Sequence, residues 1–287
     1  FTINDTTINI EGRLNSKSFF LSTDLTTQWV SGIILALPYL PLGTTLNFDV
    51  PLSLSCYPLL TIKVSETFGI SHLIDSEKIS LEKETKYQAS NFRIEGDYSA
   101  AANWLAASIF NQKLKVGNLN LESLQADFAI FNHLEKMGIS FKYEDGDFSY
   151  HSGRLSSTTL DISSSPDLFP VLAALGAVGN GILRIRGIKK LKYKETNRVQ
   201  MMVQGLKKIG ADIELNTEEV MIRGSGILEG GGEVITQNDH RIIMAFAVIA
   251  ARVRKPFVLM DFLGVSKSYP DFFDQYQNFG GKVEVLK

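Results

Sequence analysis

The chain has 287 residues, of which 44% are hydrophobic and 21% charged, and its formal net charge is −2. This composition is ordinary for a globular protein long enough for two domains, and the missing basic excess argues against nucleic-acid binding.

A single cysteine, Cys56, excludes an intrachain disulfide and a cysteine-based zinc site. It suits a reducing compartment, so we expect a cytoplasmic protein. The longest apolar run, "IIMAFAVIAA", is too short to cross a bilayer, so no membrane partner is expected. Because residue 1 is Phe, we expect these residues to begin inside a longer natural sequence.

A repeat with a period of about seventy residues runs through the chain. Four amphipathic helices are predicted to end at a glycine in the left-handed conformation, namely Gly69, Gly138, Gly210 and Gly281. β-type stretches follow each glycine, and the first three are long enough for hairpins, whereas the last, "VEVL", is short.

A second set of helices precedes the first at matching offsets. These helices are apolar nearly all round and are therefore expected to be buried. They are predicted in "TQWVSGIILALPY", "SAAANWLAASIF", "PDLFPVLAALGAV" and "DHRIIMAFAVIAA". A strand lies between the two helices of each unit, so the unit reads as buried helix, strand, loop, outer helix, glycine and hairpin.

Polar residues open each buried helix. If the repeats are related by rotation, these helix N-termini converge on a common region, which suits anions. The alternative is that the polar residues only cap their helices; residues 165–167 (Ser-Pro-Asp) read as N-cap, N1 and N2, and Asp239 reads as a cap. Capping does not explain His240 and Arg241 at the start of an otherwise apolar helix.

The stretch "LKYKETNRVQ" (residues 191–200) adds Lys194, Glu195 and Arg198, which share one flank if the stretch is helical. The alternative is an exposed ladder of ion pairs, worth only tenths of a kcal/mol. Combined with Asp167, His240, Arg241 and Lys267, these residues predict a basic pocket that holds two acids, as chemistry on a multiply charged anion requires.

Three segments resemble, in the same order, signature segments of the 5-enolpyruvylshikimate-3-phosphate synthase family: "SSSPDLFPVLAALGAVGNGILRIRGIKKLKYKETNR", "QNDHRIIMAFAVIA" and "VSKSYPDFF". The segments "STDLTTQWVSGIILALPYL", "EGDYSAAANWLAA" and "LNLESLQADFAIFNHLEKMG" are also similar to family segments, so the resemblance covers nearly the whole chain. It implies an α/β fold of repeated βαβαββ units in two domains, the inside-out α/β barrel of the enolpyruvyl transferases. The four repeats found here would be the last four of six. We therefore expect a domain boundary near Glu95, with residues 1–94 forming a partial domain of one unit and residues 95–287 a domain of three.

The resemblance implies transfer of the enolpyruvyl group from phosphoenolpyruvate to the 5-hydroxyl of shikimate 3-phosphate. Phosphate leaves after addition and elimination through a tetrahedral intermediate, without metal or organic cofactor. The implied partners are these two small anionic substrates, and a monomer is the working expectation for the oligomeric state.

Roles for single residues follow from the same motifs. Asp167 would take the hydroxyl proton, and Glu195 and Lys194 would serve proton transfer and charge stabilisation. Arg198, Arg241 and Lys267, with His240 beside them, would hold phosphoenolpyruvate, since the guanidinium fork matches carboxylate and phosphate oxygens. The residues expected to bind shikimate phosphate are Thr26, Thr27, Gln28, Tyr57 and Lys190, the last standing where the family commonly has asparagine. We expect both guanidinium groups to face a common cavity that Asp167, Glu195 and Lys267 also line.

The chain departs from the family pattern in two ways. Leu54 replaces a common sugar-phosphate-binding serine, and the Pro-Gly-Ser-Lys-Ser segment, whose lysine touches both substrates, is not found in these residues. We therefore expect the 287 residues alone to be a weak catalyst or none. Two other functions stay open: the sister transferase that acts on UDP-N-acetylglucosamine, and a catalytically silent repeat scaffold that binds an anion or a partner protein.

Overall fold

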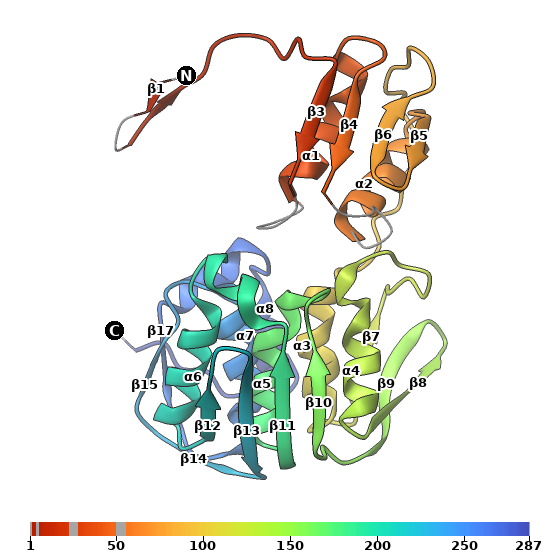
Figure 1. Ribbon diagram of the computed structural model, residues 1–287. Coiled ribbons are helices and arrows are strands. Elements are labelled where there is room, and N and C mark those ends of the chain that lie inside the picture. Colours follow the sequence, from red (N-terminus) through yellow and green to blue (C-terminus); the bar gives the residue numbers. More distant parts are fainter. Residues whose placement is uncertain (1, 4–5, 23–27, 50–55, 287) are drawn as a thin grey trace. The chain divides into compact units, whose positions relative to one another are not determined.

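The computed structural model describes residues 2–3, 6–22, 28–49 and 56–286 (Figure 1). The chain folds into two compact units, Phe1–Arg93 and Ile94–Lys287, and the division lies next to Glu95. Both units are mixed α/β. None of the helices in the described part of the chain has the length and apolar character needed to cross a membrane.

The first unit contains a four-stranded sheet in the order β3-β4-β6-β5. Its strands are β3 (Ser18–Leu21), β4 (Thr45–Phe48), β5 (His72–Asp75) and β6 (Lys78–Leu81). β3 and β4 are parallel, whereas the β5–β6 hairpin joins β4 antiparallel. The helices are α1 (Gln28–Ala36), η1 (Leu37–Tyr39) and α2 (Cys56–Thr67), and the short pair β1 (Thr2–Ile3) and β2 (Ile8–Asn9) lies outside the sheet.

The second unit repeats this arrangement. Its four-stranded sheet, in the order β10-β11-β13-β12, has the same strand directions as the sheet of the first unit. The strands of the unit are β7 (Lys115–Gly117), β8 (Ile139–Glu144), β9 (Asp147–Gly153), β10 (Thr158–Asp161), β11 (Asn180–Arg186), β12 (Asp212–Leu215), β13 (Glu219–Ser225), β14 (Leu228–Gly230), β15 (Glu233–Ile235), β16 (Val253–Lys255) and β17 (Val258–Met260). β7, β9 and β8 form a three-stranded sheet, and β14 with β16 and β15 with β17 form parallel pairs.

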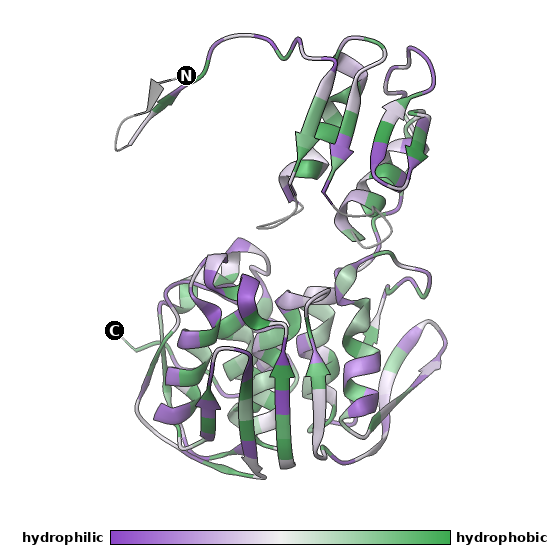
Figure 2. Ribbon diagram, in the orientation of Figure 1, coloured by the Kyte–Doolittle hydropathy of each residue, from purple (hydrophilic) through white to green (hydrophobic). Residues whose placement is uncertain are grey.

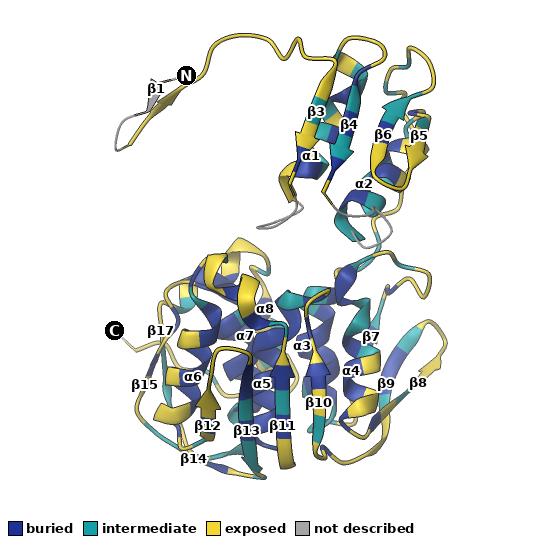
Figure 3. Cartoon of the chain, in the orientation of Figure 1, coloured by how far each residue is buried: buried dark blue, intermediate teal, exposed yellow. Residues whose placement is uncertain are grey.

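Helices fill the centre of the second unit. The inner helices are α3 (Tyr98–Ser108), α5 (Phe169–Ala177) and α7 (His240–Ile249), which pack on one another. Every residue of α5 is buried, and Figure 3 shows α5 and α7 almost wholly in the buried colour. The outer helices are α4 (Ile130–Lys136), α6 (Arg198–Lys208) and α8 (Phe272–Asn278). The short 3₁₀ helices are η3 (Ala126–Ala129), η4 (Pro166–Leu168), η5 (Ile188–Tyr193), η6 (Ala250–Arg252) and η7 (Phe262–Lys267).

This layering follows from the sequence pattern. The inner helices carry apolar side chains on all sides, so they are stable only when buried. Helix α6 mixes polar and apolar residues (Figure 2) and covers the core with its apolar face. The predicted inside-out architecture, with helices inside and strands outside, is therefore confirmed in kind. Within the described residues the strands form separate small sheets and do not close into a barrel.

Two details of the predicted repeat are wrong. Helix α8 ends at Asn278, and the glycine with left-handed backbone after it is Gly280 (φ 93°), not Gly281. The other three predicted glycines do have positive φ, between 86° and 95°. The final segment "VEVL" forms no strand within the described residues 281–286.

The contact between α6 and α7 depends on a glycine. A Cβ atom on Gly205 would lie 2.6 Å from Cζ of Phe246 and 2.9 Å from Cγ1 of Val234, too close for real atoms. We expect Gly205→Ala to lower the free energy of unfolding by about 1–2 kcal/mol, since overpacking outweighs the gain in helix propensity. The matched control is Gly32→Ala in α1, where no atom of the described residues lies within 4 Å of the added Cβ; it should raise stability by up to about 1 kcal/mol. Denaturant titration measures both, and equal effects would show that the close contact does not limit packing.

Candidate active site

Charged side chains gather at the starts of the inner helices of the second unit. Asp97 caps α3 by accepting a hydrogen bond from the amide of Ser99 at 2.9 Å, and Asp239 caps α7 by accepting one from the amide of Arg241 at 3.0 Å. The predicted capping role of Asp239 is therefore confirmed. Residues 165–167 behave differently, because η4 precedes α5 and the Ser165 hydroxyl makes no cap; it lies 3.2 Å from Nε2 of His133 instead.

Arg198 is the first residue of α6 and lies at the centre of this cluster. Its Nε donates to Oδ2 of Asp239 at 2.8 Å and its Nη1 to Oδ1 of Asp167 at 2.6 Å, while its Nη2 bonds a carboxylate oxygen of Glu195. Helix α6 starts only here, so Lys194 and Glu195 lie in the segment before it rather than on its flank. The interpretation of the stretch as an exposed ion-pair ladder is wrong, because Arg198 is 0% exposed.

Burial explains why three acids surround this one cation. A guanidinium group loses its hydration when buried, and only charge-assisted hydrogen bonds compensate for that loss. Burial alone would lower the pKa of Arg198, but Asp239, Asp167 and Glu195 raise it above its ordinary value. The expectation that Arg198 faces an open cavity is therefore wrong: its three nitrogens bond carboxylates, and Glu195, which is 45% exposed, covers its outer side.

Asp167 is shared by three cations. Its carboxylate oxygens lie 3.2 Å from Nζ of Lys194, 2.6 Å from Nη1 of Arg198 and 3.4 Å from Nη2 of Arg241. Burial would raise the pKa of Asp167, but the positive charges of Arg241, Lys194 and Arg198 outweigh it and hold the pKa to about 2. The carboxyl group is therefore ionised at neutral pH, which is the form that accepts a proton.

The two arginines do approach each other, through Asp167, as the sequence analysis predicted. Arg241 is less tightly held than Arg198: its acidic neighbours are Asp167 at 3.4 Å and Asp127 at 3.9 Å, and its side chain is 17% exposed. Its buried Nε has no hydrogen-bond partner among the described residues. Arg241 can therefore still donate to an anion, whereas every nitrogen of Arg198 already bonds a carboxylate.

Two further predicted residues lie at the start of α7. Lys267, the last residue of η7, is exposed and donates from Nζ to the carbonyl of Asn238 at 3.0 Å. His240 is buried, and its Nδ1 finds no hydrogen-bond partner in the part of the chain that the structure describes. Burial first, and then the charge of Arg241, lower the pKa of His240 below its ordinary value, so the ring is neutral at physiological pH.

The remaining predicted residues lie elsewhere or outside the described residues. Thr26 and Thr27 belong to the part of the chain that the structure does not describe. Gln28 is the exposed first residue of α1, and Tyr57 lies half-buried in α2, so both belong to the first unit. Lys190 lies in η5 and lines a cavity of about 890 Å³ with Arg186 and other residues.

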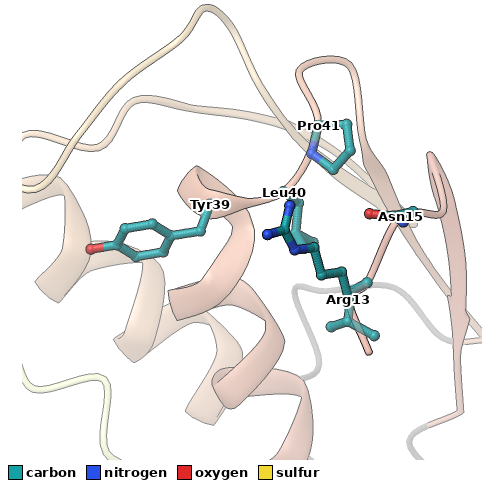
Figure 4. Close-up of a pocket in the computed structure, with 6 residues that line it drawn as sticks. Arg13, Asn15, Tyr39, Leu40 and Pro41 are labelled. Atoms are coloured by element: carbon teal, nitrogen blue, oxygen red, sulfur yellow. The ribbon is translucent and has the colours of Figure 1, made fainter. Parts of the chain in front are cut away.

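A second cavity, of about 510 Å³, lies in the first unit between the segment around Arg13 and the end of η1 (Figure 4). Its labelled side chains are mostly exposed, and Arg13 extends along Leu40 while Tyr39 points away from it. Neither cavity contains Asp167, Arg198 or Arg241. The charged cluster is thus distinct from both hollows.

Comparison with known proteins identifies the family. The family model described as EPSP synthase (3-phosphoshikimate 1-carboxyvinyltransferase) matches residues 2–276. The chain belongs to the EPSP synthase family. Among proteins named 3-phosphoshikimate 1-carboxyvinyltransferase, it is 32% identical over 282 residues to that of Clostridium novyi (strain NT), covering 98% of this chain and 65% of the relative. It is 34% identical over 276 residues to that of Clostridium botulinum (strain Eklund 17B / Type B), covering 96% of this chain and 64% of the relative.

The fold agrees with this assignment. EPSP synthase from Acinetobacter baumannii superposes with a TM-score of 0.77 at 22% identity, over 95% of this chain and 65% of that one. The chain thus spans slightly less than two thirds of the length of these EPSP synthase relatives.

Sequence reasoning missed two features of this charged cluster. Asp127 faces Arg241, and Asp239 bonds Arg198 and Thr196 in addition to capping α7. The sequence predicts only the capping role of Asp239, and it does not single out Asp127, because nothing in the local sequence shows that η3 approaches α7. Within the described residues, no group of three or more His, Cys, Asp or Glu side chains could hold a metal ion.

Proposed function

We propose that the gene product containing these residues transfers the enolpyruvyl group of phosphoenolpyruvate to the 5-hydroxyl of shikimate 3-phosphate. One observation carries the proposal: in a member of the EPSP synthase family, the ionised Asp167 lies among Lys194, Arg198 and Arg241 at the starts of the inner helices. The substrates are both multiply charged anions, and Lys194, Arg241 and Lys267 are cations of the cluster with exposed surface.

The reaction needs a proton acceptor for the attacking hydroxyl, and Asp167 fits that role. Oxygen attacks C2 of phosphoenolpyruvate as its proton goes to the carboxylate and C3 gains a proton; loss of a proton from C3 then expels phosphate. In the free protein, the pKa of about 2 makes Asp167 a weak base. Anions bound to Lys194 and Arg241 cancel part of that positive field, so substrate binding raises the pKa of Asp167 toward the range of an effective base.

The neighbouring residues divide the remaining work. Glu195, exposed beside Lys194, is the second acid available for proton transfer, and Lys194 stabilises developing negative charge. Arg241, Lys267 and the neutral His240 are the proposed ligands of phosphoenolpyruvate. Arg198 can bind substrate only if Glu195 moves away from its Nη2. In the free protein, Arg198 holds the Asp167 carboxylate in place.

The sugar phosphate has its own set of proposed ligands. They are Thr26, Thr27, Gln28, Tyr57 and Lys190. We assign residues 1–94 to a partial domain and 95–287 to a nearly complete one, because one repeat precedes the division and three follow it. The cytoplasmic location and the monomeric state stay predictions.

The test is a turnover assay on the full gene product. Phosphate release should require both phosphoenolpyruvate and shikimate 3-phosphate, and the 287-residue chain alone should release little or none. UDP-N-acetylglucosamine serves as the alternative acceptor. Turnover with that acceptor alone would assign the protein to the sister reaction, whereas no turnover with either acceptor would leave a silent scaffold.

A further inference from the structure

Asp127 is a buried carboxylate for which the proposed reaction gives no role. It is 2% exposed, and its Oδ1 has no hydrogen-bond partner within the described residues. Its Oδ2 accepts a hydrogen bond from the Ser99 hydroxyl and lies 3.9 Å from Nη1 of Arg241. An ionised group with an unsatisfied buried oxygen is costly, so its position calls for a reason.

The surrounding structure holds Asp127 in place. Gln125, the N-cap of η3, accepts from the amide of Tyr98 at 2.8 Å and donates to Oε1 of Glu95 at 2.7 Å and to the carbonyl of Gly96 at 2.9 Å. These bonds fasten η3 to the start of α3, and Ser99 then orients the carboxylate. These hydrogen bonds therefore hold Asp127 in a fixed position facing Arg241.

Arg241 lies between two carboxylates that compete for it. Asp167 contacts Nη2 at 3.4 Å and Asp127 faces Nη1 at 3.9 Å, and both distances are long for charge-assisted hydrogen bonds. Without Asp127, the attraction of Asp167 would be unopposed, and Arg241 would close onto it in a bidentate pair. An arriving anion would then have to break that pair before it could bind.

We propose that Asp127 is a positioning residue, which holds the Arg241 guanidinium off Asp167 so that its donors stay available for the anionic group of the substrate. The inference rests on the proposed function and deepens it, since it says what keeps the substrate-binding arginine and the base apart. Asp127 acts through Arg241 and touches no substrate.

A pH dependence follows. Burial, with the charges of Asp167 and Asp97, raises the pKa of Asp127 to about 6, against the opposing effects of Arg241 and Ser99. The charged groups facing it are thus Arg241 from α7, Asp167 from η4 and Asp97 before α3. Above pH 6 the Asp127 carboxyl group is ionised and attracts the Arg241 guanidinium group. Below pH 6 the carboxyl group is neutral, and this attraction is lost.

The test compares Asp127→Asn with the wild type in the full gene product. At pH 8 we expect the KM for phosphoenolpyruvate to rise about tenfold, with kcat and the KM for shikimate 3-phosphate changed less than about threefold. The ratio of the two KM values, variant to wild type, should fall toward one at pH 5. Taking the ratio removes the effect of substrate ionisation, which is the same for both proteins. A merely structural defect in the variant would persist at pH 5, so the ratio would stay above one.

Two further variants make the test specific. Ser99→Ala, which removes the hydrogen bond that orients Asp127, should shift the KM in the same direction but less. Glu135→Gln removes an exposed charge on α4 and should change neither constant. An unchanged or lower KM in Asp127→Asn at pH 8, or a ratio independent of pH, overturns the inference.

Binding separates this inference from the proposed function. Calorimetry measures the Kd of phosphoenolpyruvate in the presence of shikimate 3-phosphate, without turnover. Wild type that binds but does not turn over contradicts the proposed function alone, and the Kd ratio then replaces the KM ratio. Binding by the wild type with an unchanged Kd in the variant overturns the inference alone, and a wild type that binds neither substrate overturns both.

Discussion

Replacing Arg198 by alanine is expected to lower the free energy of unfolding of the second unit by about 3–5 kcal/mol, the usual cost of breaking a buried ion pair from one side. Asp167 and Asp239 would remain buried without the cation that both of them bond. For a unit of this size the loss corresponds to a fall in Tm of roughly 6–20 °C. Denaturant and thermal unfolding of the purified chain measure it.

Arg223→Ala is the matched control. Arg223 on β13 also bonds two carboxylates, Asp212 at 3.1 Å and Glu214 at 2.8 Å, but it is 40% exposed. Water screens that network, so its loss should lower the free energy of unfolding far less than the loss of Arg198 does. Similar losses for the two variants would show that the burial of Arg198 does not set its contribution.

Asp167→Asn should lower kcat of the full gene product by about 10²–10⁴-fold, the range that a general base contributes, with a smaller change in KM for either substrate. The amide keeps the size and much of the hydrogen bonding of the carboxyl group but does not take up the hydroxyl proton. Steady-state kinetics with both substrates varied provide the measurement. Asp145→Asn, in the exposed β8–β9 turn, is the control and should keep wild-type kcat.

The same substitution carries a stability effect that must be kept apart from the kinetic one. The native pKa of Asp167, about 2, is depressed from its usual 3.8, so its ionisation stabilises the fold above pH 4 by about 2 kcal/mol. That contribution is lost as the pH falls from about 4 to about 2, where the variant and the wild type should converge. Kinetics are therefore compared near neutral pH, after unfolding curves confirm that Asp167→Asn is folded. A folded variant with wild-type kcat would rule out Asp167 as the base.

Much of the fold is predictable because its signals are local. The apolar surface of α5 and α7 predicts burial, and Gly69, Gly138 and Gly210 mark where the outer helices end. The prediction of Gly281 in place of Gly280 is wrong because two adjacent glycines satisfy the same C-terminal signal, and only the backbone conformation distinguishes them. Strand β10, which precedes the inner helix α5, is short and carries no strong periodicity, so the sequence does not reveal it as a separate element.

The sequence predicts which residues form the site but not which of them bond one another. Residue types and motif resemblance select Asp167, Lys194, Arg198 and Arg241, which the structure brings together. The complete burial of Arg198 depends on carboxylates far along the chain, and only Glu195 is near enough in sequence to suggest an ion pair. Asp127 gives no local signal, because its relation to Arg241 exists only after α3 and α7 have packed.

The cluster around Arg241 joins three successive repeats at one point, since Asp127, Asp167 and Arg241 belong to one repeat each. In a linear solenoid each repeat contacts only its neighbours, so copies can be gained or lost during evolution at little cost. In this unit the first and the third repeat also contact each other, through Asp127 and the charge of Arg241. Duplication or deletion of a single copy would leave that charge mismatched, so the number of repeats in this unit is fixed by the same side chains that make its chemistry.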